Sequence, residues 1–185
     1  MAADAFMHVS GGDVVEGETC DTEFHHSQGW FEITKFSWTA QSPDEDASDA
    51  PKGSKASDDN AASQRDMAVQ DFRVEKFIDR ASPDLFRACM KKTEFERALI
   101  SVRESGAETR RPYLKLHFEN VKVKSVDWAL TPGDSSDDAG EETVTFTYGK
   151  MYIEYLHQLG TGKHEAPKVG GWDLIGHKPW GPTRR

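Results

Sequence analysis

The chain has 185 residues, of which 36% are hydrophobic, 10% aromatic and 30% charged. This is the length of one ordinary domain, and the aromatic content is high enough to build a core. No apolar run approaches the ~18 residues of a membrane-spanning helix, and residues 1–13 lack the basic and apolar regions of a secretory signal. The composition therefore argues against membrane insertion and against conventional export.

The net charge of −9 comes from two acidic segments. Residues 41–66 carry a net charge of −4 and residues 131–142 carry −5, so the rest of the chain is formally neutral. Neither segment contains an aromatic or branched aliphatic residue, so neither can bury enough apolar surface to offset its ordering entropy. We predict mobile loops at 41–66 and 131–142. The absence of a clustered basic run argues against a nucleic-acid partner.

Between these segments the sequence alternates with the period of β-strands. In residues 113–130 the apolar positions form three alternating subsets, and the phase slips by one residue between subsets. Residues 142–155 form two such subsets, and the slip falls at Gly149, a residue type that tolerates the positive φ of a bulge. Long strands that change face at bulges curl a sheet towards a barrel. Further strands are predicted at 5–9, 30–39, 69–79, 95–103 and 171–175.

One helix is predicted to begin at Ser82. Its hydroxyl can cap the helix, Pro83 suits the first helical position and Asp84 places an acid in the first turn. The apolar residues that follow at helical spacing predict packing against the core rather than a partner groove: Leu85, Phe86, Cys89 and Met90. We therefore predict a single, mostly β domain over residues 1–185, with one short flanking helix and a flexible tail after residue 176.

The sequence contains no motif for catalysis, cofactor binding or metal binding. Cys20 with His25 and His26 is the only local cluster of soft ligands, and adjacent histidines on an extended chain point to opposite sides. Cys20 and Cys89 are interpreted as free thiols of a reducing compartment. Residues 160–164 contain a Gly-Lys pair without the spacing of a phosphate loop. We expect no catalytic residue, no cofactor and no metal.

The middle and end of the chain closely resemble the haemolysin-coregulated protein (Hcp) family, the inner-tube subunits of bacterial type VI secretion systems. The order and spacing of many short matches carry the resemblance, and no single match decides it. The matching positions are 69–72, 76–79, 82–85, 88–89, 102–103, 113–115, 123–126, 149–150 and 171–173, with Phe95, Ala98, Glu142, Val144, Phe146 and Tyr155.

The resemblance implies a two-sheet β-barrel with one flanking helix, assembled as a hexameric ring. Rings of this family stack into a hollow tube that a contractile sheath propels into a neighbouring cell, and some members hold small effector proteins in the lumen. The implied partners are thus other copies of the chain, spike and sheath proteins, and possible effectors. The implied localisation is cytoplasmic during assembly and then extracellular, without a cleavable signal peptide. The family resemblance also implies a structural protein rather than an enzyme.

Four residues that flank the segment 41–66 are candidate subunit or ring contacts: Trp38, Val69, Gln70 and Asp71. For Trp38, a place in the core is the alternative, since tryptophans are heavily buried in most folds. Segment 41–66 occupies the loop that reaches towards the adjacent ring in the family, and it is longer and more acidic here. We expect it to weaken or regulate ring stacking through like-charge repulsion.

Two other functions stay open at this point. The first is a carrier whose ring lumen binds effectors, which is compatible with a tube subunit. The second is a monomeric β-barrel that binds a small ligand or an effector in its own interior. Trp172 with Asp173 is expected to pack the closing strand rather than to form a ligand site.

Overall fold

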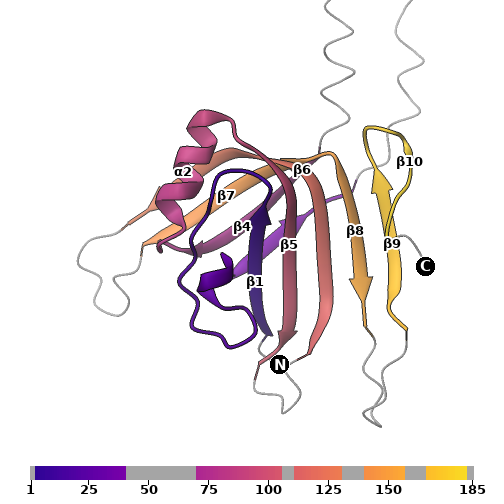
Figure 1. The fold of residues 1–185 in the computed structure, drawn as a ribbon, viewed down its shortest axis with the longest axis horizontal. Helices are drawn as coiled ribbons and strands as arrows, with labels where there is room; N and C mark the ends of the chain where they lie inside the picture. The colour runs from indigo at the N-terminus through magenta and orange to yellow at the C-terminus, as the bar shows by residue number, and fades with distance from the viewer. Residues whose placement is uncertain (1–2, 41–69, 106–110, 131–139, 157–165, 183–185) are drawn as a thin grey trace, which may run out of the picture.

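The computed structural model describes residues 3–40, 70–105, 111–130, 140–156 and 166–182. In these residues the chain forms ten strands, one α-helix and one short 3-10 helix (Figure 1). Val69, the whole acidic segment 41–66, and residues 131–139 lie outside the described part of the chain. None of the described helices is long and apolar enough to cross a membrane.

Seven strands follow one another in a single antiparallel sheet, in the order β10-β9-β8-β6-β5-β1-β2. Three more strands continue from β6 in the order β7-β4-β3. In chain order, the strands are β1 (Ala3–Ser10), β2 (Phe31–Ile33), β3 (Lys35–Trp38), β4 (Gln70–Phe77), β5 (Glu94–Glu104), β6 (Pro112–Ala129), β7 (Glu141–Tyr148), β8 (Lys150–Tyr155), β9 (Lys168–Asp173) and β10 (Lys178–Pro179). The helices are η1 (His26–Gln28) and α2 (Ser82–Lys91).

Strand β6 bends the sheet into two layers. Its first half pairs with β8 and its second half with β7, so that β4 and β7 cross behind β5 and β6 (Figure 1). The two predicted slips of phase lie where the strand bends: Asn120 has a φ of 56°, and the register with β7 shifts between Val123 and Ser125. The long, face-switching strand predicted at 113–130 is therefore confirmed.

The slip predicted at Gly149 is also confirmed, but its physical reason is different. Gly149 separates β7 from β8, and the positive φ lies at Asn120 and not at the glycine. A Cβ at residue 149 would lie 2.6 Å from Ile175 Cδ1 and 3.2 Å from Asn120 Nδ2. A larger residue here would have to displace the Ile175 side chain, a close approach that the sequence pattern does not reveal.

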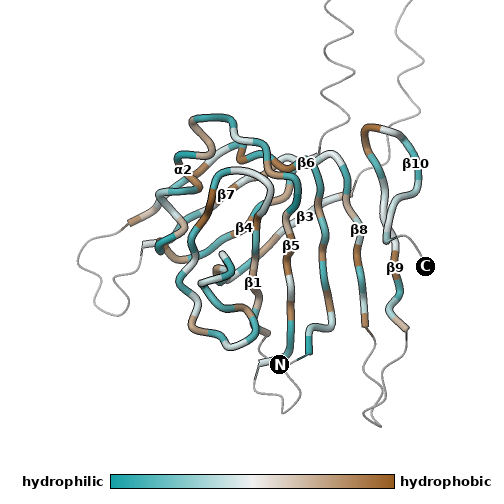
Figure 2. The backbone as a smooth tube through the Cα atoms, viewed as in Figure 1, coloured by the Kyte–Doolittle hydropathy of each residue, from teal (hydrophilic) through white to brown (hydrophobic). Residues whose placement is uncertain are grey.

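The core fills the space between the two layers. Figure 2 shows hydrophobic and hydrophilic residues alternating along β5 and β6, as expected for strands with one buried face. Phe72 of β4 stacks on Phe118 of β6, with ring centroids 4.1 Å apart, and on Phe146 of β7 at 4.9 Å. These three rings are fully buried and join the two layers.

The mostly β fold with one helix is confirmed, but the sheet formed by the described residues does not close into the predicted two-sheet barrel. The strand expected at 30–39 is divided: β2 pairs with β1, and β3 pairs with β4. Among the described residues no ladder joins β2 to β3 or to β4, so the sheet is not closed. The chain passes from one layer to the other at Thr34, whose backbone N–H donates to Glu75 O at 2.8 Å.

The helix α2 begins where predicted, but Ser82 does not cap it. The N-cap is Ala81, and Asp79 Oδ1 accepts a hydrogen bond from the Ala81 N–H at 2.8 Å. The Ser82 hydroxyl instead donates to Glu142 Oε2 at 2.6 Å. A capping pattern in the sequence cannot distinguish these roles, because the competing acceptor lies 60 residues away.

Two further boundaries differ from the sequence prediction. Glu141 and Glu142 belong to β7 rather than to an acidic loop ending at 142, since Glu142 is buried against Lys76. The chain after Gly176 turns back, and Lys178–Pro179 forms β10 beside β9. This short strand lies within the segment that the sequence predicts as a flexible tail.

Candidate functional site

The predicted contact residues that the structure describes lie at one end of β3 and β4. Trp38 faces Phe72 across the β3–β4 ladder, and Gln70 and Asp71 begin β4. Asp71 Oδ2 accepts from Lys124 Nζ at 2.5 Å in an exposed ion pair. The structure thus brings three of the four predicted residues together, and Val69 lies outside the described residues.

Trp38 packs partly into the core. Its indole Nε1 donates to the Tyr148 hydroxyl oxygen at 2.5 Å, and its ring contacts the edge of the hydrophobic cluster. Burial raises the pKa of Tyr148 above its usual value, so the hydroxyl stays neutral. The half-buried indole agrees with the core interpretation, while its accessible part keeps the predicted assembly contact open.

A buried polar network fixes α2 against the sheet. Lys76 Nζ lies 2.7 Å from Glu142 Oε2, 2.6 Å from Asp79 Oδ1 and 3.0 Å from Ser82 Oγ. The side chains of Lys76 and Glu142 are fully buried, and that of Asp79 is nearly so. Burial raises the pKa of Asp79, and the neighbouring Lys76 ammonium partly offsets this. The network links β4, β7 and the first turn of α2.

The apolar residues of α2 lie on two sides of the helix, one buried and one exposed. The prediction that all of them pack on the core is therefore corrected. Leu85 is fully buried, whereas Phe86 and Met90 are 47% and 63% exposed. Phe86 lies beside Trp128 of β6, with ring centroids 6.0 Å apart, and Leu130 follows Trp128 at the end of the strand. We call these four exposed residues the α2 surface: Phe86, Met90, Trp128 and Leu130.

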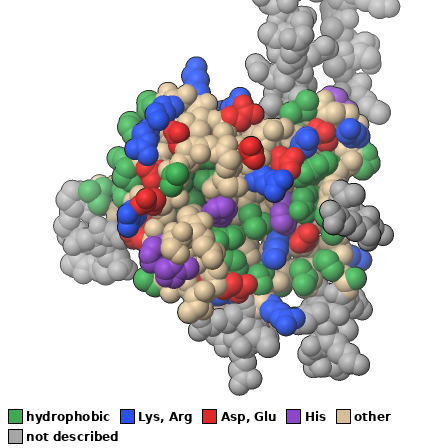
Figure 3. Space-filling view, viewed as in Figure 1, with side chains coloured by type: hydrophobic (Ala, Val, Ile, Leu, Met, Phe, Trp, Pro, Cys, Tyr) green, Lys and Arg blue, Asp and Glu red, His purple; other side chains and the backbone are tan. Residues whose placement is uncertain are grey.

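A hydrogen bond to the buried network fixes the orientation of Trp128. Its Nε1 donates to Glu142 Oε1 at 2.7 Å, so the buried network also supports the α2 surface. Figure 3 shows hydrophobic side chains along the edge of the molecule next to α2, with Lys and Arg side chains close by.

A second apolar surface lies at the β9 side of the sheet. There the layer of β10-β9-β8-β6-β5-β1-β2 extends beyond the layer of β7, β4 and β3. Directly paired residues share a face of a sheet, and the pairs Phe118–Met151 and Met151–Trp172 continue the core face outward from β6 to β9. Phe118 and Met151 are buried, but Trp172 is 43% exposed. Burial therefore falls across the sheet towards its β9 side.

The same face continues along β8 and β9. Ile153 is half-buried and pairs with Gly170, and Tyr155 is 45% exposed and pairs with Lys168. A Cβ at Gly170 would have no atom within 4 Å, so the space beside the glycine is open. We call the face formed by Ile153, Tyr155, Gly170 and Trp172 the β9 surface. The expectation that Trp172 packs the closing strand holds only in part, since much of its indole is exposed.

The fold and these surfaces can now be compared with known proteins. The family model "Type VI secretion system effector, Hcp" matches residues 6–155, which run from β1 to the end of β8. The chain belongs to the Hcp family. A curated Hcp relative, "Protein hcp1" of Pseudomonas aeruginosa, is 31% identical over 107 residues, which cover 57% of this chain and 64% of the relative. The match to this curated relative thus spans less than two thirds of its length.

Solved structures agree with the family assignment. "Structure of a type six secretion system protein" superposes with a TM-score of 0.73 at 25% identity and covers 97% of this chain and 100% of that one. Hcp1 from Salmonella typhimurium has a TM-score of 0.69 at 21% identity with the same coverage, which supports the fold. The sequence resemblance to the Hcp family is therefore confirmed.

A second buried ion pair joins Arg103, near the end of β5, to Asp21 in the loop that follows β1. Arg103 of β5 donates through Nη1 to Asp21 Oδ1 at 3.1 Å and contacts the other carboxylate oxygen through Nη2. The guanidinium also lies over the rings of Phe6 and Phe24. Hydrogen bonds from Arg103 hold the pKa of the Asp21 carboxyl far below its usual value, and the Glu23 and Phe24 N–H groups assist.

This pair predicts a loss of stability in acid. Asp21 has a lower pKa when folded than when unfolded, so its contribution is complete above the unfolded pKa of about 4 and is lost as the pH falls below it. We expect Asp21→Asn to cost about 2–3 kcal/mol at pH 7, because a buried charged hydrogen bond is removed. Urea unfolding at pH 7, 5, 4 and 3 should show the two proteins converging as the pH falls. A difference that stays constant with pH would contradict this role.

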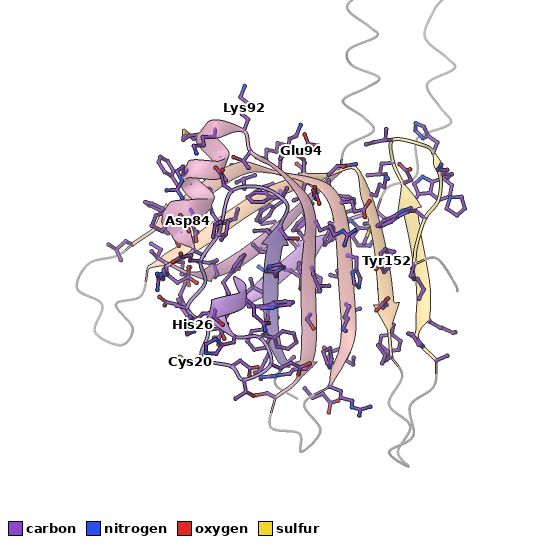
Figure 4. The ribbon with its side chains drawn as sticks, in the orientation of Figure 1. Cys20, His26, Asp84, Lys92, Glu94 and Tyr152 are labelled. Atoms are coloured by element: carbon purple, nitrogen blue, oxygen red, sulfur yellow. The ribbon has the colours of Figure 1, made fainter. Side chains whose placement is uncertain are left out.

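Of the cluster of soft ligands considered in the sequence, His26 is the first residue of η1, His25 is its N-cap, and Cys20 lies in the preceding loop (Figure 4). Cys20 is exposed and Cys89 half-buried, and both are free. Within the described ranges no group of three or more His, Cys, Asp or Glu side chains is arranged to hold a metal ion.

Sequence reasoning missed both exposed apolar surfaces of this Hcp chain. The pattern of α2 contained Phe86 and Met90 but did not reveal that they lie outside the buried stripe, which runs through Leu85 and Ala88. The signal that could have found this is the small residue Ala88, which lies on the same side of the helix as Leu85 and opposite to Phe86 and Met90. The exposure of Trp172 depends on where the second layer ends, and the sequence carries no signal for that.

Proposed function

We propose that this chain is the structural subunit of a type VI secretion tube, assembling as a hexameric ring. The observation that carries the proposal is the Hcp family match over residues 6–155, together with a fold match covering nearly the whole chain. The exposed apolar side chains on two flanks of the described residues support it. A non-enzymatic role follows from the family and stays a prediction.

The finer parts of the proposal rest on the family resemblance. Rings would stack into a tube inside a contractile sheath, with spike proteins at its end, and the lumen could carry small effectors. Assembly in the cytoplasm and release through the type VI machinery would need no cleavable signal peptide. The acidic segment 41–66 would weaken or regulate the stacking of rings, and its charge predicts that low salt increases the repulsion.

The alternative of a monomeric carrier with a ligand in its own interior is not favoured. Four aromatic side chains fill the space between the layers, and each is at most 1% exposed: Phe72, Phe118, Phe146 and Tyr148. A small-molecule site needs an open, mostly apolar cavity, and these rings occupy the place where it would lie.

Size is the first test of the ring. Light scattering coupled to gel filtration should give a particle of six times the chain mass of 20.7 kDa, and negative-stain images should show rings with an empty centre. A particle of one chain mass at all accessible concentrations would contradict the proposed ring.

A further inference from the structure

We propose that residues 178–182 form a detachable cap on the edge of β9, and that this edge pairs with the β9 of a second copy when the cap is absent. We call residues 178–182 the edge cap. The inference concerns the open end of the sheet and does not rest on the proposed ring.

The edge cap covers one end of an open sheet. β9 pairs with β8 along its whole length, and β10 follows it as the last strand of the sheet (Figure 1). Only two residues of β10 belong to the ladder, opposite Trp172 and Asp173. The unpaired N–H and C=O groups of an edge strand offer a template to another chain, so the segment that covers β9 decides what can pair there.

Backbone groups of β9 point alternately to its two neighbours. The Leu174 N–H donates to Gly149 O at 3.0 Å on the β8 side, whereas Gly171 O accepts from the Trp180 N–H at 3.1 Å on the cap side. In an antiparallel ladder, successive residues direct their N–H and C=O groups to opposite sides. Three residues of β9 therefore direct theirs to the cap: Val169, Gly171 and Asp173.

The outer side of the edge cap is a poor template for a further strand. Because the Trp180 N–H points to β9, the preceding Pro179 directs its nitrogen away from the sheet, and this nitrogen carries no hydrogen. Short strands, lysine and proline protect sheet edges from pairing, and β10 consists of the exposed Lys178 and Pro179. β9 has six residues and no proline, so its protection depends on the cap.

One aromatic side chain anchors the edge cap. The ring centroids of Trp180 and Tyr152 of β8 are 5.0 Å apart, and the Lys150 ammonium lies 5.8 Å from the Trp180 ring. The indole reaches β8 across Gly171, where a Cβ would lie only 2.3 Å from Tyr152 Cβ and 2.6 Å from Trp180 O. Glycine within a strand commonly marks such a close approach. Because the rest of β10 is exposed, the cap can open locally while β9 stays paired with β8.

A second copy of β9 can take the place of the edge cap. β10 runs antiparallel to β9, and two identical edges can pair antiparallel about a two-fold axis. The residues that face the edge then meet one another, with Gly171 opposite Gly171 and Val169 opposite Asp173. This contact joins one surface to itself, so each uncapped edge gains one partner.

The test compares the full chain with a variant that ends at His177. This truncation keeps the turn after β9, in which Asp173 Oδ1 accepts from the N–H groups of Ile175 and Gly176. At equal concentration, light scattering should give the truncated protein at least about twice the particle mass of the full chain, because each uncapped edge gains a partner.

Hydrogen exchange locates the new contact. In the truncated protein, the Val169 and Gly171 amides should exchange at least ~10-fold more slowly at high than at low protein concentration, because pairing between copies protects them. In the full chain, Trp180→Ala should speed exchange at Gly171 and raise the particle mass, since the anchor of the cap is lost. Lys178→Ala, an exposed change in the same strand, is the matched control and should do neither.

A proline in β9 distinguishes strand pairing from non-specific aggregation. In the truncated chain, Val169→Pro removes an N–H that faces the edge and keeps the ladder with β8, so the particle mass should return to that of the full chain. Val169→Thr keeps the N–H and the branched shape and should leave the higher mass unchanged. If the truncated chain does not fold, Trp180→Ala in the full chain carries the same comparison.

Two results would overturn the edge cap. One is a particle mass that removal or loosening of the cap does not change, and the other is a higher mass that Val169→Pro does not lower. Both would leave the proposed tube function standing, because that function is tested by the mass of the full chain alone. A full chain that stays monomeric, with a truncated chain that dimerises, would support the cap and contradict the ring.

Discussion

Glu142→Ala is expected to lower the free energy of unfolding by about 3–5 kcal/mol, the range for breaking a buried ion pair from one side. The substitution leaves Lys76, whose side chain is fully buried, with Asp79 as its only carboxylate. It also removes the acceptor of the Trp128 indole N–H and of the Ser82 hydroxyl. Several buried donors thus lose their partner at once, and each loss carries a desolvation cost.

Urea unfolding at fixed protein concentration measures this effect, because assembly makes apparent stability depend on concentration. Glu141→Ala is the matched control. Glu141 is the preceding residue of β7 and is exposed, so its removal should change stability by no more than about 0.5 kcal/mol. Equal effects of the two substitutions would show that the buried network does not hold the fold.

Glu142→Gln separates charge from hydrogen bonding. The amide keeps one oxygen acceptor, but its NH₂ group must face either Lys76 or the Trp128 indole, both of which are donors. We expect a smaller loss than for alanine, of about 2 kcal/mol.

The strands of this fold could be predicted because their period survives in the sequence. The three phases of 113–130 correspond to the bends of β6 at Asn120 and between Val123 and Ser125. Alternation is a local property, so it can be read without knowing the partners of a strand. Closure of the sheet is a non-local property, and the sheet formed by the described residues does not close as predicted.

The buried ion pair could not be predicted for the same reason. Glu142 is the last residue of the acidic segment 131–142 and the first residue of the alternating pattern of 142–155. Its place inside the protein depends on Lys76, 66 residues away, which pairs with it across the β4–β7 ladder. Only the register of two strands brings the opposite charges together, and composition alone favours solvent for both.

The candidate assembly surfaces show how far a helical pattern can be interpreted. The spacing of Leu85, Phe86, Cys89 and Met90 predicts an amphipathic helix, and α2 is one. The spacing does not show which side of the helix is buried, because small residues such as Ala88 also belong to the buried side. Phe86 and Met90 therefore lie on the exposed side of the helix, where Phe86 contacts Trp128.

Phe72→Ala is expected to destabilise the protein by about 3–5 kcal/mol, the range for removing a phenyl ring from a core. Phe72 is 1% exposed and stacks on Phe118 and Phe146, which belong to β6 and β7. Its removal opens a cavity at the centre of the contact between the two layers, where no exposed group can move in to fill it. Stacking adds to the loss, since such aromatic pairs stabilise beyond their buried area.

Urea unfolding compares Phe72→Ala with Arg73→Ala, the exposed neighbour on the other face of β4. The arginine variant should lie within about 0.5 kcal/mol of the unaltered protein. Phe72→Leu keeps part of the volume and should cost less than the alanine change. If the alanine and leucine variants were equally stable, the rings would not be packed as tightly as their centroid distances indicate.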